Sequence, residues 1–151
     1  MIQADDVFKF LKNGVHLGAI SIGMSTHEIK TIYGEPTSIT GSDDIGYLFY
    51  KEVRLGFWGD KIDEIAIIFD KEFVSFSFYL ELLESIQSLD SDTKLNEVIL
   101  ILNYLDINWK STYDKNNREY FFIETNNNIW ITFDLEENRI IKISYTGLRP
   151  N

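Results

Sequence analysis

The pattern of hydrophobic and polar positions is clearest over residues 45–70, where three runs of β-branched and aromatic residues are separated by short polar turns. In the middle run Val53, Leu55 and Phe57 alternate with other residues, which leaves Trp58 on the opposite side. A period of two is typical of a strand with one buried face. The stretch therefore predicts an antiparallel meander of three strands.

The same layout returns over residues 120–145, and helical spacing of apolar residues precedes both meanders. The expected helices are residues 4–12, 26–33, 76–89 and 93–105, and the expected strands are residues 37–40, 45–50, 53–58, 62–70, 110–114, 120–123, 129–133 and 140–145. The predicted fold class is α+β, built from two tandem units, residues 1–70 and 71–151. Each unit has two helices followed by a meander of three or four strands, with the helices on one face of the sheet. One continuous α+β domain with similar halves is the alternative.

A helix start is predicted at Ser25, because Glu28 follows three residues later in the pattern of a capping box. The neighbouring Ser25, His27 and Glu28 could suggest a nucleophile with a base. Residues one or two positions apart on a helix point in different directions, so the capping role explains them better. Gly34 and Pro36 are expected to end this helix.

The 24 acidic residues outnumber the 14 basic ones, for a net charge of −10. Splitting the chain after Asp70 gives 11 acids and 6 bases before the cut and 13 and 8 after it, so each half carries −5. Such a charge argues against nucleic-acid binding and is compatible with a basic protein partner. Hydrophobic residues make up 44% of the chain, enough for a substantial core.

Few residues with metal-binding or nucleophilic chemistry are available, because the chain has no cysteine and two histidines. Neither an HExxH nor a calcium-loop spacing occurs. We therefore expect no catalytic residue, no metal and no cofactor. The alternative is a small-molecule-binding or enzymatic domain with a pocket between helices and sheet, for which His16, Tyr47 and Asp63 would be the candidates.

No apolar run is long enough to span a bilayer, and the first residues do not resemble a signal peptide. A cytoplasmic protein without membrane contact is expected.

A short helix opened by Ile22–Ser25 and Glu28, closed by Tyr33–Pro36 and followed by the meander at Tyr47–Phe69, resembles the BamE-like fold. Two such units in tandem resemble the β-lactamase inhibitory protein. The second half departs from this pattern, because Ile107–Trp109 stands where a Gly-x-Pro stop would be. The resemblance implies a sheet face that grips another protein. Small acidic proteins of this type are also similar to bacterial toxin-immunity proteins.

The candidate binding residues follow from the alternation of the two meanders. Trp58 and Trp130 are expected to point away from the core, and tryptophan is enriched at binding hot spots. The residues predicted to contact a partner are Asp43, Asp44, Arg54, Trp58, Glu64, Trp130 and Asp134, and Lys142 would share their face. The alternatives are that another part of the chain or a second copy covers the tryptophans, and that Asp43 and Asp44 form only a solvated turn.

These observations favour a non-catalytic protein-binding module. The most specific prediction is an immunity-type inhibitor that neutralises a bacterial toxin or enzyme through an acidic, aromatic sheet surface. Its partner would be a protein, a basic toxin or enzyme in the simplest case. A homodimer formed by pairing of open sheet faces is left open.

Overall fold

The computed structural model describes residues 2–69, 74–113, 116 and 118–147. Its helices are α1 (Ala4–Asn13), α2 (Thr26–Tyr33) and α3 (Leu95–Tyr104), with the short 3-10 helix η1 (Glu81–Leu83). Its strands are β1 (His16–Leu17), β2 (Ile20–Ser21), β3 (Ser38–Gly41), β4 (Ile45–Phe49), β5 (Val53–Trp58), β6 (Lys61–Ile68), β7 (Ser75–Leu80), β8 (Ser85–Asp90), β9 (Trp109–Tyr113), β10 (Tyr120–Thr125), β11 (Ile129–Asp134) and β12 (Arg139–Thr146).

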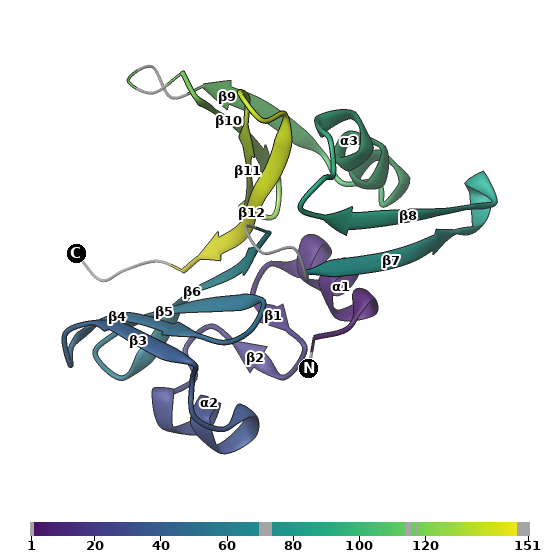
Figure 1. The fold of residues 1–151 in the computed structure, drawn as a ribbon. Coiled ribbons are helices and arrows are strands. Elements are labelled where there is room, and N and C mark those ends of the chain that lie inside the picture. The colour runs from purple at the N-terminus through teal and green to yellow at the C-terminus, as the bar shows by residue number, and fades with distance from the viewer. Residues whose placement is uncertain (1, 70–73, 114–115, 117, 148–151) are drawn as a thin grey trace.

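One antiparallel sheet of eight strands dominates the molecule, in the order β3-β4-β5-β6-β12-β11-β10-β9 (Figure 1). It consists of two four-strand meanders, β3–β6 and β9–β12, which meet through their last strands. At this junction Ile67 pairs with Ile143, and Ala66 pairs with Ser144. The two meanders therefore form one continuous sheet, whose strands turn strongly from one end to the other (Figure 1).

Both meanders carry a register shift at the same place. On β5 it lies between Gly56 and Phe57, and on β11 between Thr132 and Phe133. Arg54 pairs with Ala66 just as Trp130 pairs with Ser144. Since Ala66 and Ser144 also pair with each other, an approximate two-fold axis of the hydrogen-bond register passes between them. Such bulges increase the local twist of a sheet.

One face of the sheet, the inner face, is covered by the remaining elements. In Figure 1, α1, α3 and the β7–β8 hairpin lie to the right of the sheet, and α2 lies below it. The core between these layers includes Leu55, Ile65, Ile131 and Ile143, all of which are buried. Phe8 of α1 stacks on Phe78 of β7 at 4.0 Å between ring centroids. Because successive side chains of a strand point to opposite faces, the apolar side chains of these strands lie together on the inner face.

The predicted helix over residues 76–89 is wrong, because this stretch forms the β7–η1–β8 hairpin. Phe76, Phe78 and Leu80 are buried and alternate with exposed residues, which is the period of a strand. The residues expected on the buried side of that helix, Leu83 and Ile86, are exposed. The predicted fold class of two helix–helix–meander units is therefore also wrong. The described structure is one large sheet with three α-helices and two separate hairpins, β1–β2 and β7–β8.

The local predictions around the first two helices are confirmed. Helix α1 ends at Gly14, which has a φ of 77°, a conformation that glycine adopts without strain. At the start of α2 the backbone N–H of Glu28 donates to Ser25 Oγ at 3.1 Å, and Ser25 N–H donates to Glu28 Oε2 at 2.7 Å. None of the described helices is both long and apolar enough to cross a membrane.

Candidate functional site

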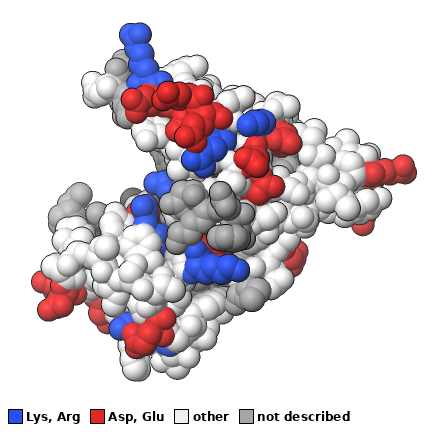
Figure 2. All heavy atoms as spheres, viewed as in Figure 1, with Lys and Arg blue, Asp and Glu red and all other residues white. Residues whose placement is uncertain are grey.

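The second face of the eight-stranded sheet, which we call the open face, has no described helix or strand over it (Figure 1). The strand registers place on it side chains that include Tyr47, Phe49, Arg54, Trp58, Lys61, Glu64, Ala66, Lys110, Phe122, Glu124, Trp130, Thr132, Asp134, Arg139, Lys142 and Ser144. Figure 2 shows a recess on the left of the view between the two ends of the molecule, with both acidic and basic side chains around it.

The middle of the open face is built from small residues. Ala66 and Ser144 sit on the two-fold axis and are buried, and Gly56 lies on the neighbouring strand β5. Larger side chains stand on both sides in the same cross-strand row, with Arg54 next to Ala66 and Trp130 next to Ser144. The small residues leave room for these long side chains to extend over the axis.

A charged cluster occupies the side of the axis that belongs to the first meander. Arg54 Nη2 donates to Glu64 Oε1 at 2.5 Å, and the two side chains are only 23% and 10% exposed. The guanidinium carbon lies 4.6 Å from the centre of the Tyr47 ring, the geometry of a cation–π contact. Nε of Arg54 is buried and has no hydrogen-bond partner among the described residues.

Lys142 approaches this cluster from β12. Its pKa lies below the ordinary value of 10.5, first because of burial and then because of the positive charge of Arg54, while Glu64 acts in the opposite direction. No ion pair joins Lys142 to a carboxylate within the part of the chain that the structure describes. The carboxylate of Asp63 also reaches this face, because a Cβ at Gly56 would lie 3.0 Å from Asp63 Oδ1 and 3.4 Å from the Tyr47 ring.

The second meander contributes aromatic and paired charged side chains. Phe122 and Trp130 meet edge to face at 6.2 Å between ring centroids. Glu124 pairs with Trp130 on one side and with Lys110 on the other, and Lys110 Nζ lies 2.9 Å from Glu124 Oε2. The predicted outward orientation of the two tryptophans is confirmed, since Trp58 is 42% and Trp130 is 37% exposed. Accessible tryptophans of this kind are costly to leave in water and favour contact with a partner.

The structure brings together Arg54, Trp58, Glu64, Trp130 and Asp134 on one face, as predicted. It does not place Asp43 and Asp44 with them. These two residues follow β3 and line a hollow of about 400 Å³ beside α2. That hollow is formed by the inner-face side chains Ile39, Leu48 and Phe57.

The prediction that the open face itself is acidic is wrong. Its three acids on the strands, Glu64, Glu124 and Asp134, are accompanied by five bases, Arg54, Lys61, Lys110, Arg139 and Lys142. The excess of negative charge in the chain therefore lies elsewhere on the surface, for example at Asp5 and Asp6 in the first turn of α1.

Of the candidates for the alternative function, Tyr47 and Asp63 lie near each other over Gly56, whereas His16 lies on the separate β1–β2 hairpin. His16 is exposed on β1, where its Nδ1 lies 2.7 Å from Ser21 Oγ. Tyr47 is on the open face, and Asp63 is the buried extra residue of the bulge on β6. Among the described residues, no group of three His, Asp or Glu side chains is arranged to hold a metal ion.

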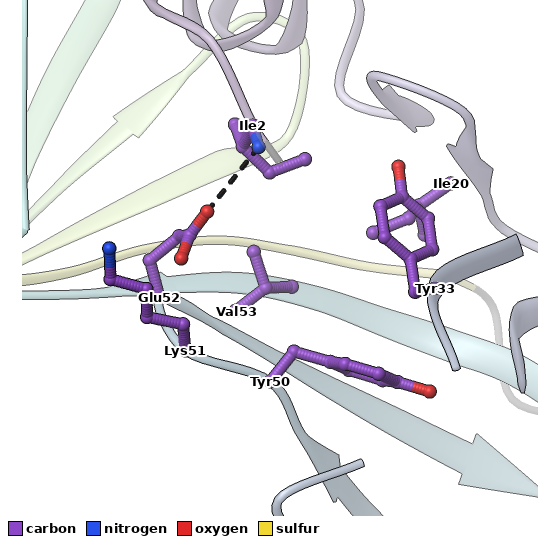
Figure 3. Close-up of a pocket in the computed structure, with 7 residues that line it drawn as sticks. All are labelled: Ile2, Ile20, Tyr33, Tyr50, Lys51, Glu52 and Val53. Atoms are coloured by element: carbon purple, nitrogen blue, oxygen red, sulfur yellow. Dashed lines mark hydrogen bonds between the residues drawn. The ribbon is translucent and has the colours of Figure 1, made fainter. Parts of the chain in front are cut away.

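A separate pocket of about 220 Å³ opens beside the β4–β5 turn (Figure 3). Its lining residues are Ile2, Ile20, Tyr33, Tyr50, Lys51, Glu52 and Val53. Most of the lining is apolar, and the hydrogen bond drawn in Figure 3 joins the backbone N–H of Ile2 to Glu52 Oε1 at 3.4 Å. None of the three predicted pocket residues, His16, Tyr47 and Asp63, lines it.

The sequence pattern alone does not identify several features of the open face and of the β7–β8 hairpin. The contributions of Phe49, Lys110, Phe122 and Glu124 to the open face follow from alternation once the register is known, but the register was not predictable from the turns. The exposed apolar tip of the β7–β8 hairpin was hidden by its assignment to a helix. The hairpin tip consists of Tyr79, Leu82, Leu83 and Ile86.

No protein-family model, curated protein or solved structure shows significant similarity to this chain.

Proposed function

We propose that this protein is a non-catalytic binding module that holds another protein against the open face, in the manner of an immunity-type inhibitor of a toxin or enzyme. The observation that carries the proposal is the placement of Trp58, Trp130 and the Arg54–Glu64 pair on one sheet face with no described element over it. Tryptophan and arginine are the residues most enriched at binding hot spots.

The shape of the site supports binding better than catalysis. The open face is broad and spans both meanders, whereas a catalytic site would need a nucleophile, a base or a metal directed at one point. The charged side chains on it are paired across strands, as in Arg54–Glu64 and Lys110–Glu124. Paired charges and edge-to-face aromatics form a preorganised surface, which lowers the entropy cost of association.

Photo-crosslinking tests the location of the interface. A benzophenone amino acid is placed at Trp58 or Trp130 in the full chain, and at Leu100 on α3 as an exposed control. We expect the two open-face positions to capture the same protein in the native cell and the Leu100 position to capture none. Crosslinks to that protein from Leu100 alone would place the interface on the other side of the molecule and contradict the proposal.

Inhibition tests the functional class. The captured protein, once purified, is assayed for its own toxic or enzymatic activity with increasing amounts of this chain. We expect stoichiometric inhibition by the wild-type chain and substantial loss of inhibition with Trp130→Ala. Full activity of the partner in the saturated complex would contradict the inhibitor role and leave a binding role without inhibition.

A further inference from the structure

We propose that the pocket beside the β4–β5 turn binds a small uncharged molecule with a flat aromatic ring. This inference goes beyond the proposed function, because it concerns a second site and a different class of ligand. Val53 contributes to the pocket from the inner face of β5, whereas Trp130 stands on the open face. The two sites therefore lie on opposite sides of the large sheet.

The first argument is the size of the pocket. Its volume of about 220 Å³ exceeds that of an apolar cavity of about 150 Å³, which is large enough to bind benzene. Packed protein interiors contain few voids larger than one water molecule, so a space of this size is unusual beside a core. The pocket therefore has room for a six-membered ring with a short substituent.

The second argument is the chemistry of the walls. Ile2, Ile20 and Val53 supply buried aliphatic side chains, and Tyr33 and Tyr50 supply two rings whose centroids lie 6.1 Å apart at an interplanar angle of 58°. In Figure 3 the two rings lie on one side of the pocket, and the side chains of Ile2 and Val53 lie on the other. Aromatic rings attract one another in offset-stacked or tilted arrangements beyond the effect of burial alone. The walls therefore favour an aromatic ligand over a saturated one of the same size.

The third argument is that hydrogen bonds hold the walls in place. The hydroxyl of Tyr50 donates to the carbonyl oxygen of Gly34 at 3.0 Å, which fixes the ring against the end of α2. The backbone N–H of Tyr50 donates to the carbonyl oxygen of Val53 at 2.8 Å and closes the β4–β5 turn. Glu52 Oε1 accepts from the backbone N–H of Ile2 at 3.4 Å, so the segment before α1 is tied to the same turn. Preformed walls of this kind are typical of small-molecule sites, because ordering them on binding would cost affinity.

Charge indicates that the ligand is uncharged. Of the described lining residues, Lys51 and Glu52 are charged, and their charges are opposite. A charged group placed against the aliphatic wall would lose hydration without gaining a hydrogen-bond partner. The net charge of −10 also repels anions at long range.

The surroundings of the pocket indicate a free molecule and not a protein side chain. A protein that inserts a ring as an anchor also buries other apolar side chains around it. None of the large apolar side chains that are exposed in the described part of the chain lines this pocket. The walls can therefore hold a ring, but no apolar surface for a larger interface accompanies them.

Titration of the full chain with three small probes tests the proposal. Benzyl alcohol carries a flat ring, cyclohexylmethanol carries a puckered ring with the same number of non-hydrogen atoms, and benzoate carries the flat ring with a negative charge. Binding is followed through the backbone amide NMR signals of Ile20, Tyr33, Tyr50 and Val53. We expect saturable shifts with benzyl alcohol at a dissociation constant of about 1 mM, and binding of the other two probes that is weaker by about fivefold. The absence of saturable shifts, or equal binding of cyclohexylmethanol, would overturn the inference.

Intermolecular NOEs in the wild-type chain locate the probe without any substitution. We expect NOEs from the ring protons of benzyl alcohol to the methyl groups of Ile2, Ile20 and Val53. NOEs only to the methyl groups of the exposed hairpin tip, at Leu82 and Ile86, would place the ligand elsewhere and overturn the inference.

Substitutions of Tyr50 test the role of the aromatic wall. Tyr50→Leu removes the ring, and Tyr50→Phe keeps the ring but removes the hydroxyl. We expect Tyr50→Leu to lose the preference for benzyl alcohol over cyclohexylmethanol and Tyr50→Phe to keep it. Tyr113→Leu makes the same change at an exposed residue of β9, at the far edge of the sheet, and is the matched control. An unchanged preference in Tyr50→Leu would overturn the inference.

A capped peptide with a central phenylalanine tests whether the ring comes from a protein. We expect the peptide to shift the same amide signals with lower affinity than benzyl alcohol. Tighter binding of the peptide would assign the pocket to a protein side chain and overturn the inference. None of these measurements depends on the crosslinking at Trp58 and Trp130, so the two proposals are tested separately.

Discussion

The two meanders share a backbone plan but place different chemistry on the open face. Arg54 on β5 and Trp130 on β11 occupy equivalent positions, because each pairs with a residue on the two-fold axis. The same relation makes Glu64 equivalent to Lys142, since Gly56 pairs with Glu64 and Thr132 pairs with Lys142 just before each bulge. The first meander thus supplies a guanidinium and a carboxylate where the second supplies an indole and an ammonium.

This difference shows which part of the site depends on the backbone and which on side chains. The shared register and the two bulges give both meanders the same twist, so they set the shape of the open face. Side chains that differ between equivalent positions make the face chemically asymmetric. A partner can therefore bind in only one of the two orientations that the backbone symmetry would allow.

The largest expected effect on stability comes from substitutions at the junction of the two meanders. Ile67 and Ile143 pair across it and are fully buried. Ile67→Ala and Ile143→Ala should each lower the free energy of unfolding by about 3 kcal/mol, the usual cost of truncating a buried isoleucine. Urea unfolding followed by tryptophan fluorescence and by circular dichroism measures this. Two separate transitions, one for each meander, would show that the meanders unfold independently.

The next largest effect distinguishes Arg54 from its equivalent, Trp130. Arg54→Ala leaves Glu64 partly buried without its cation, so it should lower the free energy of unfolding by about 2 kcal/mol. Trp130→Ala should cost less than half as much, because Trp130 is 37% exposed, but it should weaken partner binding more. Thermal unfolding and a binding assay check both effects. Equal stability losses would mean that the two positions have the same structural role.

A smaller effect is expected at the helices that precede the two meanders. Helix α2 has both hydrogen bonds of a capping box, whereas at α3 Lys94 N–H donates to Glu97 without a side-chain acceptor at the cap. Ser25→Ala should therefore cost about 1 kcal/mol. Lys94→Ser should raise the free energy of unfolding. Urea titration measures both changes, and a loss of stability in Lys94→Ser would contradict this account.

The cap of α2 also has a pH dependence. Hydrogen bonds from the Ser25 backbone and side chain lower the pKa of Glu28 below its ordinary value of 4.5. The stabilisation is therefore complete above pH 4.5 and is lost as the pH falls through the lower pKa of the folded state. In Glu28→Gln this acid-dependent part of the unfolding free energy should be absent, which unfolding curves at several pH values would detect.

The smallest effect concerns Lys142, whose pKa is lowered in the folded state. The unfolded chain then binds the proton more tightly, so stability should rise as the pH increases through the folded pKa towards the ordinary value of 10.5. Lys142→Met should be slightly more stable than wild type at neutral pH and should lack this alkaline rise. A lower stability of Lys142→Met at pH 7 would indicate that the ammonium group has a stabilising partner.

Much of the sheet could be predicted from the sequence because alternation reports directly on burial. The strands of both meanders and the outward positions of Trp58 and Trp130 follow from it. The β7–β8 hairpin could not be recognised, since the spacing of Leu80, Leu83 and Ile86 fits a helix as well as a hairpin tip. Local spacing does not say which side of an element the core will cover.

The pairing of β6 with β12 is a long-range contact, and no local signal specifies it. That pairing determines which charges gather at the centre of the open face. For the same reason the acidic character of the whole chain does not predict the mixed charge of the open face. The charge and turn position of Asp43 and Asp44 predict a place among the partner-contacting residues, but the structure places these two residues beside α2.

The hairpin tip has a consequence for behaviour in concentrated solution. Leu82 and Ile86 are 86% and 70% exposed, and apolar groups that project in this way attract one another between molecules. At low ionic strength the charge of −10 keeps molecules apart. At about 0.15 M salt the Debye length shortens to about 8 Å. Added salt should therefore increase the self-association of this protein, and Leu82→Ser should reduce the self-association at the same salt concentration.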